Sequence, residues 1–128
     1  MKLLLDTHAF LWFVNDDSRL SEHAKTVMES PENELWLSIA SLWEMAIKYS
    51  LGKLELTDPL ETFLDEQLSE NQIQLLSIDK PHVIHLGQLP FHHRDPFDRM
   101  IIAQGMVESL PLVSIDQHFP AYGVELIW

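Results

Sequence analysis

The chain contains no cysteine among its 128 residues. Disulfide scaffolds, zinc ribbons, iron–sulfur clusters and thiol catalysis are therefore excluded. Positive charge is scarce as well: Lys and Arg together number 8, against 20 Asp and Glu, and the formal net charge is -12. A nucleic-acid coat protein with a wide basic face is not expected from this balance. An acidic protein can still act on nucleic acid where its carboxylates gather around metal ions.

Long apolar runs are missing too. No segment approaches the roughly 18 residues of a membrane span, and a charge arrives at Asp6, too early for a signal peptide. Low-complexity segments and long internal repeats are also absent. The composition, 46% hydrophobic and 22% charged, is typical of a globular protein. We expect a single domain over residues 1–128, located in the cytoplasm and without a membrane partner.

Short apolar runs alternate with segments of helical periodicity along the chain. The alternation predicts strands at 3–5, 35–37, 75–78, 112–115 and 124–128, and helices at 8–14, 18–29 (from Ser18 or Ser21), 39–51, 58–68, 79–86 and 98–107. Strands separated by helices favour an α/β fold with a parallel sheet covered on both faces, in three α/β/α layers. Ligands of such sheets bind outside the carboxyl ends of the strands, where the strand order switches.

The predicted helix at 39–51 has the clearest apolar pattern. Its apolar residues recur at i, i+3, i+4, i+7 and i+8, which is one face of a 3.6-residue period, namely Ile39, Leu42, Trp43, Ala46 and Ile47. We expect this face in the core, with most of the large aromatic residues, Trp12, Phe13, Trp36 and Trp43. The nearly all-apolar segment 10–14 is a candidate surface for self-association.

Carboxylates stand at the predicted strand ends. Asp6 directly follows the first strand, and Asp116 follows the fourth. If those strands are neighbours, the two residues lie about 5 Å apart, and two ionised carboxylates that close call for a shared proton or a cation. Mg²⁺ commonly takes one or two carboxylates together with water and substrate phosphate. Asp98, at a predicted helix start, and Glu44, beside the apolar stripe, could face the same edge.

Each acid also has a purely structural explanation. Asp6 and Asp98 suit helix N-caps, and Glu44 suits an i, i+4 pair with Lys48 on a solvated face. Asp116 suits an Asx turn. Taken singly, each position is better explained in this way. Four acids at corresponding places of one alternating chain nevertheless favour a shared site, without deciding it.

Four segments resemble one protein family. Residues 4–12, LLDTHAFLW, resemble the opening of a PIN domain, in particular of bacterial PIN proteins that begin with LLDTHxxLW. Residues 93–104, HRDPFDRMIIAQ, resemble the HRDPFDRMLIAQ segment of the same group. Residues 41–48, SLWEMAIK, are similar to its SxWExxIK helix, and residues 112–119, LVSIDQHF, to its LVTxDxxF segment. The resemblance therefore covers nearly the whole chain, and its first two segments are the specific ones.

The resemblance implies a fold, an activity and partners. PIN domains are metal-dependent ribonucleases with sheet order 3-2-1-4-5, and many bacterial members are VapC-type toxins of toxin–antitoxin pairs. The acidic quartet would fall on Asp6, Glu44, Asp98 and Asp116 and would hold one or two Mg²⁺ or Mn²⁺ ions, with Asp95 as a second-tier ligand. The resemblance also implies a homodimer and an antitoxin whose tail covers the acids. Such a tail would need a cation such as Arg.

Other residues near these acids have weaker assignments. Thr7 could hydrogen-bond a site carboxylate or cap a helix, and Ser114 could support the site or be an ordinary strand residue. Candidates to offset the phosphate charge of RNA are Lys48, Arg94 and Arg99, each of which could instead form a salt bridge. With so few cations, the expected substrate is a structured RNA recognised at few points.

Three further residues, Asp79, His92 and His93, could be mistaken for metal ligands but are better explained by structural roles. Asp79 follows a strand as Asp116 does, but the implied order puts its strand two positions from the first, roughly 10 Å away, which favours a helix cap. His92 and His93 suit a loop pair that shapes the cleft better than a zinc site, because adjacent side chains rarely face one ion.

Two other functions compete with a nuclease. The first is a catalytically silent PIN-like module that binds RNA or protein. The second is a receiver-type phosphorylation domain, in which Asp79 would accept the phosphoryl group. A receiver also needs a Lys after its fifth strand, and the sequence ends at Trp128 without one.

Overall fold

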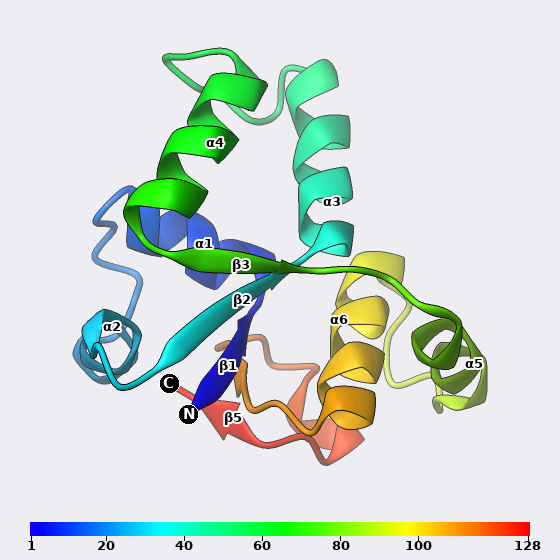
Figure 1. The fold of residues 1–128 in the computed structure, drawn as a ribbon. Coiled ribbons are helices and arrows are strands. Elements are labelled where there is room, and N and C mark those ends of the chain that lie inside the picture. Colours follow the sequence, from blue (N-terminus) through cyan, green and yellow to red (C-terminus); the bar gives the residue numbers. More distant parts are fainter.

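The computed structural model describes all residues, 1–128, and contains one five-stranded sheet. The strands are β1 (Lys2–Leu5), β2 (Glu34–Ser38), β3 (Ile73–Leu76), β4 (Leu112–Val113) and β5 (Leu126–Ile127). Their order is β3-β2-β1-β4-β5, and all four pairs are parallel (Figure 1). The expected order and the three-layer α/β/α class are therefore confirmed.

Six α-helices and one 3-10 helix connect the strands. They are α1 (Thr7–Val14), α2 (Glu22–Glu29), α3 (Ile39–Ser50), α4 (Leu60–Glu70), α5 (Lys80–Gln88), α6 (Pro96–Glu108) and η1 (Pro120–Tyr122). Ser21, and not Ser18, caps α2, because its hydroxyl accepts a hydrogen bond from the Ala24 N–H. None of these helices has the length and apolar character needed to cross a membrane.

Helix α6 begins two residues earlier than predicted. The Asp95 carboxylate accepts hydrogen bonds from the N–H groups of Phe97 and Asp98, and Pro96 occupies the first helical position. The expectation that Asp98 starts the helix was therefore wrong. Asp98 lies in the first turn, and its carboxylate does not cap the helix.

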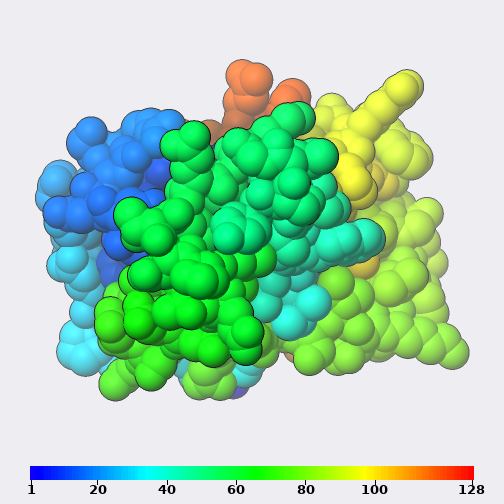
Figure 2. Space-filling model, turned by 90° about the horizontal axis from the view of Figure 1, so that it is seen from above, coloured from blue at the N-terminus to red at the C-terminus, as the bar shows by residue number.

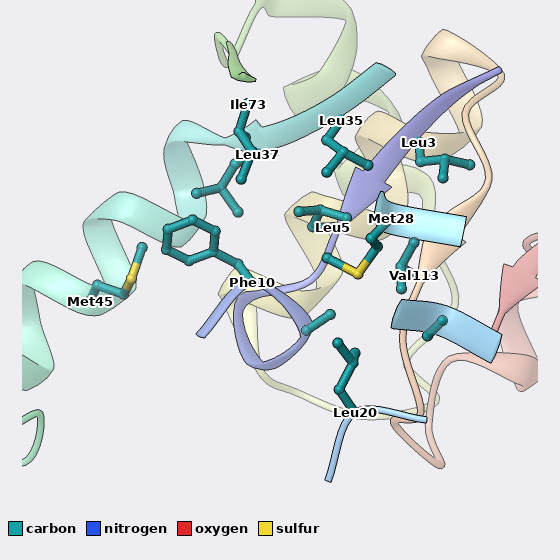
Figure 3. Close-up of a cluster of buried hydrophobic side chains, with 12 residues drawn as sticks. Leu3, Leu5, Phe10, Leu20, Met28, Leu35, Leu37, Met45, Ile73 and Val113 are labelled. Atoms are coloured by element: carbon teal, nitrogen blue, oxygen red, sulfur yellow. The ribbon is translucent and has the colours of Figure 1, made fainter. Parts of the chain in front are cut away.

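The sheet is covered on both faces. Helices α1, α2 and α4 pack on one face, where Phe10 of α1 lies among leucines of β1 and β2 (Figure 3). Helices α5 and α6, with η1, pack on the other face through buried residues such as Ile101, Ile102 and Phe119. Because both faces are covered, the central strands are rich in buried apolar residues, and β1 has three fully buried leucines in succession.

The predicted inner face of α3 is wrong. Trp43 is 59% exposed, and Ile39 and Ile47 are more than one-third exposed. The buried residues of α3 are instead Ala40, Ser41, Glu44 and Met45. The helix turns this mixed face inward because Ser41 and Glu44 have hydrogen-bond partners on α1, which offset the cost of burying them. A count of apolar residues by period cannot detect such partners.

Candidate acidic site at the β1–β4 edge

The site lies at the carboxyl ends of the two central strands. Leu5 of β1 pairs with Val113 of β4, and the Asp6 N–H continues the ladder by donating to the Val113 carbonyl at 3.1 Å. A depression opens there between α1 and the loop after β4, and its lining includes Asp6 and Asp116. In Figure 2 this loop (orange) stands between α1 (blue) and the start of α6 (yellow).

Asp6 caps α1 and also lines the depression. Its Oδ1 accepts a hydrogen bond of 2.6 Å from the Ala9 N–H and so caps α1. The side chain is also buried, and burial raises the pKa of Asp6 above its ordinary value. Hydrogen bonds from Ser114 and Ala9 lower the pKa, whereas the charge of Asp116 raises it further. The cap therefore holds in place a carboxylate that is costly to ionise.

Asp98 is a second carboxyl group of the site whose pKa is strongly raised. Its pKa is raised to about 8, first by burial and then by the charges of other carboxylates, Asp95, Asp116, Glu44 and Asp6 in decreasing order. Acids from β1, α3, the start of α6 and the loop after β4 therefore act on one another. Strongly shifted pKa values of this origin are typical of functional sites.

Glu44 reaches the same site from α3. Its side chain is only 8% exposed, so it is not the solvated member of a surface pair, although Lys48 Nζ does lie 2.8 Å from its Oε2. Thr7 donates its hydroxyl hydrogen to Glu44 Oε1 at 2.8 Å, and Ser41 lies 2.9 Å from the same hydroxyl. Because a hydroxyl has one hydrogen, Ser41 must donate to Thr7. This chain of three residues fixes the carboxylate.

The remaining acids are held by their own loops. Asp116 Oδ1 accepts the His118 N–H at 2.8 Å, which is the Asx turn considered above, and the Asp116 N–H donates to Ser114 Oγ at 3.0 Å. Asp95 is exposed and caps α6. Asp95 does not line the depression, and neither do Asp98 and Glu44. The charge of Asp95 nevertheless raises the pKa of Asp98.

The three candidate cations are placed differently. Lys48 is paired with Glu44, and Arg94 is exposed on the loop before α6. Arg99 is buried and donates hydrogen bonds to the carbonyls of Leu89 and Pro90. It anchors the loop and does not present a free charge to a substrate.

The oxygen atoms of these side chains are suitable ligands for a hard divalent cation. The converging side chains are carboxylates, with hydroxyl and backbone groups around them, and such oxygen ligands suit Mg²⁺ or Mn²⁺. No three of the acidic and imidazole groups are close enough to hold one ion as they stand. Each of three carboxylates is held by its own donor: Asp6 by the Ala9 N–H, Glu44 by the Thr7 hydroxyl and Asp116 by the His118 N–H.

Two contributing residues were missed from the sequence. Ser41 was quoted in a matched segment, and its spacing of three residues from Glu44 put it one helical turn away on the same side. His93 was quoted at the start of a matched segment and was given a role only as part of a loop pair. Its Nε2 lies 3.5 Å from Asp98 Oδ2. Burial lowers the pKa of His93, and the neighbouring His118 lowers it further.

An all-parallel sheet with order 3-2-1-4-5 and acids at its central carboxyl edge defines a class of α/β protein. The chain belongs to the PIN domain family, whose model matches residues 3–125. The sheet order excludes the receiver alternative, because β3, which leads to Asp79, is an edge strand here, whereas receivers have the order 2-1-3-4-5.

Known proteins similar to this chain include toxin–antitoxin components. A VapBC2 complex from Rickettsia felis has a chain with a TM-score of 0.73 and 17% identity, covering 98% of this chain and 97% of that one. A VapBC-5 complex from Mycobacterium tuberculosis gives a TM-score of 0.62 and 20% identity over 98% and 97%. Ribonuclease VapC16 of M. tuberculosis is 33% identical over 61 residues, which are 48% of this chain and 43% of that protein.

Proposed function

We propose that the chain is a divalent-metal-dependent endoribonuclease whose active site contains Asp6, Glu44, Asp98 and Asp116. The observation that carries the proposal is the pKa of Asp98, raised to about 8 by burial and by four other carboxylates. Several negative charges this close together destabilise the folded protein on its own. A bound cation would relieve their repulsion, so the same arrangement favours cation binding. Membership of the PIN family and the similarity to a named ribonuclease support the same activity.

The residues have distinct roles in this proposal. Asp6 and Asp98 are direct ligands of Mg²⁺ or Mn²⁺, and Asp116 binds directly or through water. Glu44 binds a second ion or orients the attacking water, and Thr7 keeps its carboxylate in place. When bound, the ion supplies a water of lowered pKa and offsets negative charge on the phosphodiester.

Two further residues support the acids, and two contact the substrate. Ser114 hydrogen-bonds Asp6, and Asp95 sets the start of α6 and hence the position of Asp98. Lys48 and Arg94 would contact RNA phosphates. Arg99 is left out of this substrate set because its guanidinium is engaged with the loop carbonyls.

We further propose that the enzyme is the toxin of a type II toxin–antitoxin pair and acts in the cytoplasm. The support is the likeness to chains of VapBC complexes. A cationic antitoxin segment would complement the acids of the site. The homodimer is also a proposal. The segment 10–14, which was expected to be its surface, packs on the core, with Phe10 buried and the other four residues partly buried. We propose the outward face of α3 around Trp43 and Ile47 instead, because neighbouring exposed apolar side chains mark interaction sites. A Trp43→Lys variant should then lose the dimer mass in light scattering.

The test of the activity is cleavage of total cellular RNA with Mg²⁺ or Mn²⁺. Wild type is compared with Asp6→Asn and Asp98→Asn, each checked for folding by circular dichroism, and with an EDTA control. The proposal expects metal-dependent cutting that both substitutions abolish. Cutting that survives both would place the activity elsewhere. Binding of RNA without cutting, in the presence of metal, would favour the silent PIN-like module.

A further inference from the structure

A tyrosine distant in sequence organises the loop beside Asp98. Tyr122 ends η1 and is 7% exposed. Its hydroxyl oxygen lies 3.2 Å from the backbone nitrogen of His93, 3.2 Å from Arg99 Nη1 and 2.7 Å from His93 Nδ1. Three groups therefore share one hydroxyl, and their chemistry determines the direction of each hydrogen bond.

The hydroxyl must donate to the imidazole. A backbone N–H and a guanidinium can only donate, so His93 N and Arg99 Nη1 use the two acceptor positions of the Tyr122 oxygen. The single hydroxyl hydrogen is left for His93 Nδ1, at the shortest of the three distances. Nδ1 is then an acceptor, and the neutral ring has its hydrogen on Nε2.

The other ring nitrogen points at the acidic site. His93 Nε2 is buried and has no hydrogen-bond partner, and Asp98 Oδ2 lies 3.5 Å from it. The His93 side chain is 8% exposed. The His118 ring stacks on it at 4.9 Å between centroids and 10° between planes, which fixes the plane in which Nε2–H points. An N–H donor so confined has one carboxylate within reach.

We infer that His93 is a positioning residue for Asp98: its Nε2–H holds Oδ2, so that the other oxygen of Asp98 is presented to the divalent cation. Arg99 and Tyr122 contribute by fixing the tautomer that makes His93 a donor. Partners of this kind, which hold a ligand without touching the metal, typically change metal affinity by about 10–100-fold when removed. This inference rests on the proposed metal site.

The first experiment measures the tautomer in the metal-free wild type. Long-range ¹H–¹⁵N NMR correlations at pH 8 distinguish imidazoles that carry hydrogen on Nε2 from those that carry it on Nδ1. We expect the Nε2–H form for His93 and a mixture of forms in Tyr122→Phe. A wild-type ring with hydrogen on Nδ1 would overturn the inference. This readout does not depend on nuclease activity.

The second experiment measures Mn²⁺ affinity by calorimetry without RNA. Asn places its amide near the Nδ1 position of histidine, and Gln places its amide near the Nε2 position. His93→Asn should therefore weaken Mn²⁺ binding by about 10-fold or more, and His93→Gln should restore most of the affinity. His92→Asn is the matched control, because His92 touches the same Tyr122 ring but is exposed and has no hydrogen bond to it.

The outcomes distinguish an error in the role of His93 from an error in the proposed function. If His93→Asn and His93→Gln bind Mn²⁺ as wild type does, the positioning role is wrong. Equal loss in both variants would also contradict it, because the amide at the Nε2 position would then bring no rescue. Wild type that binds no Mn²⁺ and cuts no RNA would refute the proposed function instead, and the NMR result would still decide the tautomer. Should His93→Asn not fold, Tyr122→Phe takes its place with an expected several-fold loss.

Discussion

Two halves of the sheet's carboxyl edge contain buried polar groups that serve different ends. Beyond β2 and β3, Ser38 donates to Gln104 Oε1, and Gln104 Nε2 donates to the Ser77 carbonyl. Beside them, His82 Nδ1 accepts the Asp79 N–H, and its Nε2 lies 2.8 Å from Glu108. Donors meet acceptors in each of these contacts, as a structural network requires.

Beyond β1 and β4, the converging groups share one sign. The carboxylates of Asp6, Glu44 and Asp116 accept hydrogen bonds from nearby donors, whereas that of Asp98 accepts none. The only ion pair of a Lys or Arg among these acids is that of Lys48 with Glu44. Burial raises the pKa values of Asp6 and Asp98, and the charges of neighbouring carboxylates raise them further. The difference teaches that burial and polarity do not by themselves mark a functional site. The mark is a set of buried carboxyl groups that face other carboxylates and have few compensating cations.

The sharpest test of this comparison uses two aspartates with nearly identical surroundings in sequence. Asp116 follows Val-Ser-Ile, and Asp79 follows Leu-Ser-Ile, but only Asp116 lies beside β1. Asp116→Asn should lower RNA cleavage by at least about 100-fold, since several kcal/mol of transition-state stabilisation depend on the metal site. Asp79→Asn should leave cleavage within about twofold and stability within about 0.5 kcal/mol, because Asn is an equally good N-cap. Similar losses in both would erase the distinction.

The complementary test removes hydrogen bonds from the network beyond β2 and β3. Gln104→Ala removes the partners of the Ser38 hydroxyl and the Ser77 carbonyl. The buried Ser38 hydroxyl then loses its acceptor, which should lower the free energy of unfolding by about 1–3 kcal/mol, while cleavage per folded molecule is retained. Urea denaturation measures the change. The control is Gln88→Ala, an exposed residue at the end of α5, and a loss as small as in that control would contradict the prediction.

The pH dependence of stability should differ between the halves. A carboxylate whose pKa is raised in the folded state contributes stability below its unfolded pKa and loses it as pH rises through the folded value. For Asp98 the window runs from the ordinary value, 3.8, to about 8. Metal-free protein should therefore lose roughly 1–2 kcal/mol across it, a discounted figure because the group is partly exposed.

Thermal denaturation at several pH values measures this loss. Asp98→Asn should flatten the dependence because it removes the titrating group, and saturating Mg²⁺ should flatten it because the cation compensates the charge. Asp65→Asn, on the exposed side of α4, is the control and should follow wild type. A wild-type melting temperature that rises steadily from pH 4 to 8 would contradict the assigned pKa direction.

The fold was largely predictable because its signals are local. Apolar runs separated by helical periods predicted the strands, and serine and proline positions predicted several helix boundaries. The start of α6 was missed by two residues because Asp95 and Asp98 both suit an N-cap, and only the hydrogen bonds to Phe97 and Asp98 decide between them. The strand order came from the family resemblance, since local patterns do not specify which strands are neighbours.

The candidate site was less predictable because its partners come from distant segments. Burial of Glu44 depends on Thr7, 37 residues earlier, and the periodicity of α3 favoured the opposite face. The orientation of His93 depends on Tyr122, 29 residues later. For Arg99 the sequence left open a contact with substrate or a salt bridge, and neither prediction included the loop carbonyls that accept its hydrogens.

Thr7 gives the smallest expected effect, because it supports the acidic half without contributing charge. Thr7→Val keeps the shape of the side chain but removes the hydrogen bond to Glu44 and leaves Ser41 without its acceptor. We expect a loss of about 1 kcal/mol in stability and a several-fold loss in cleavage, since a mispositioned carboxylate still has its charge. Thr7→Ser, which keeps the hydroxyl, should recover both. If Thr7→Val lowered cleavage as much as Asp116→Asn, the hydroxyl itself would act in catalysis, and the functional half would extend beyond its carboxylates.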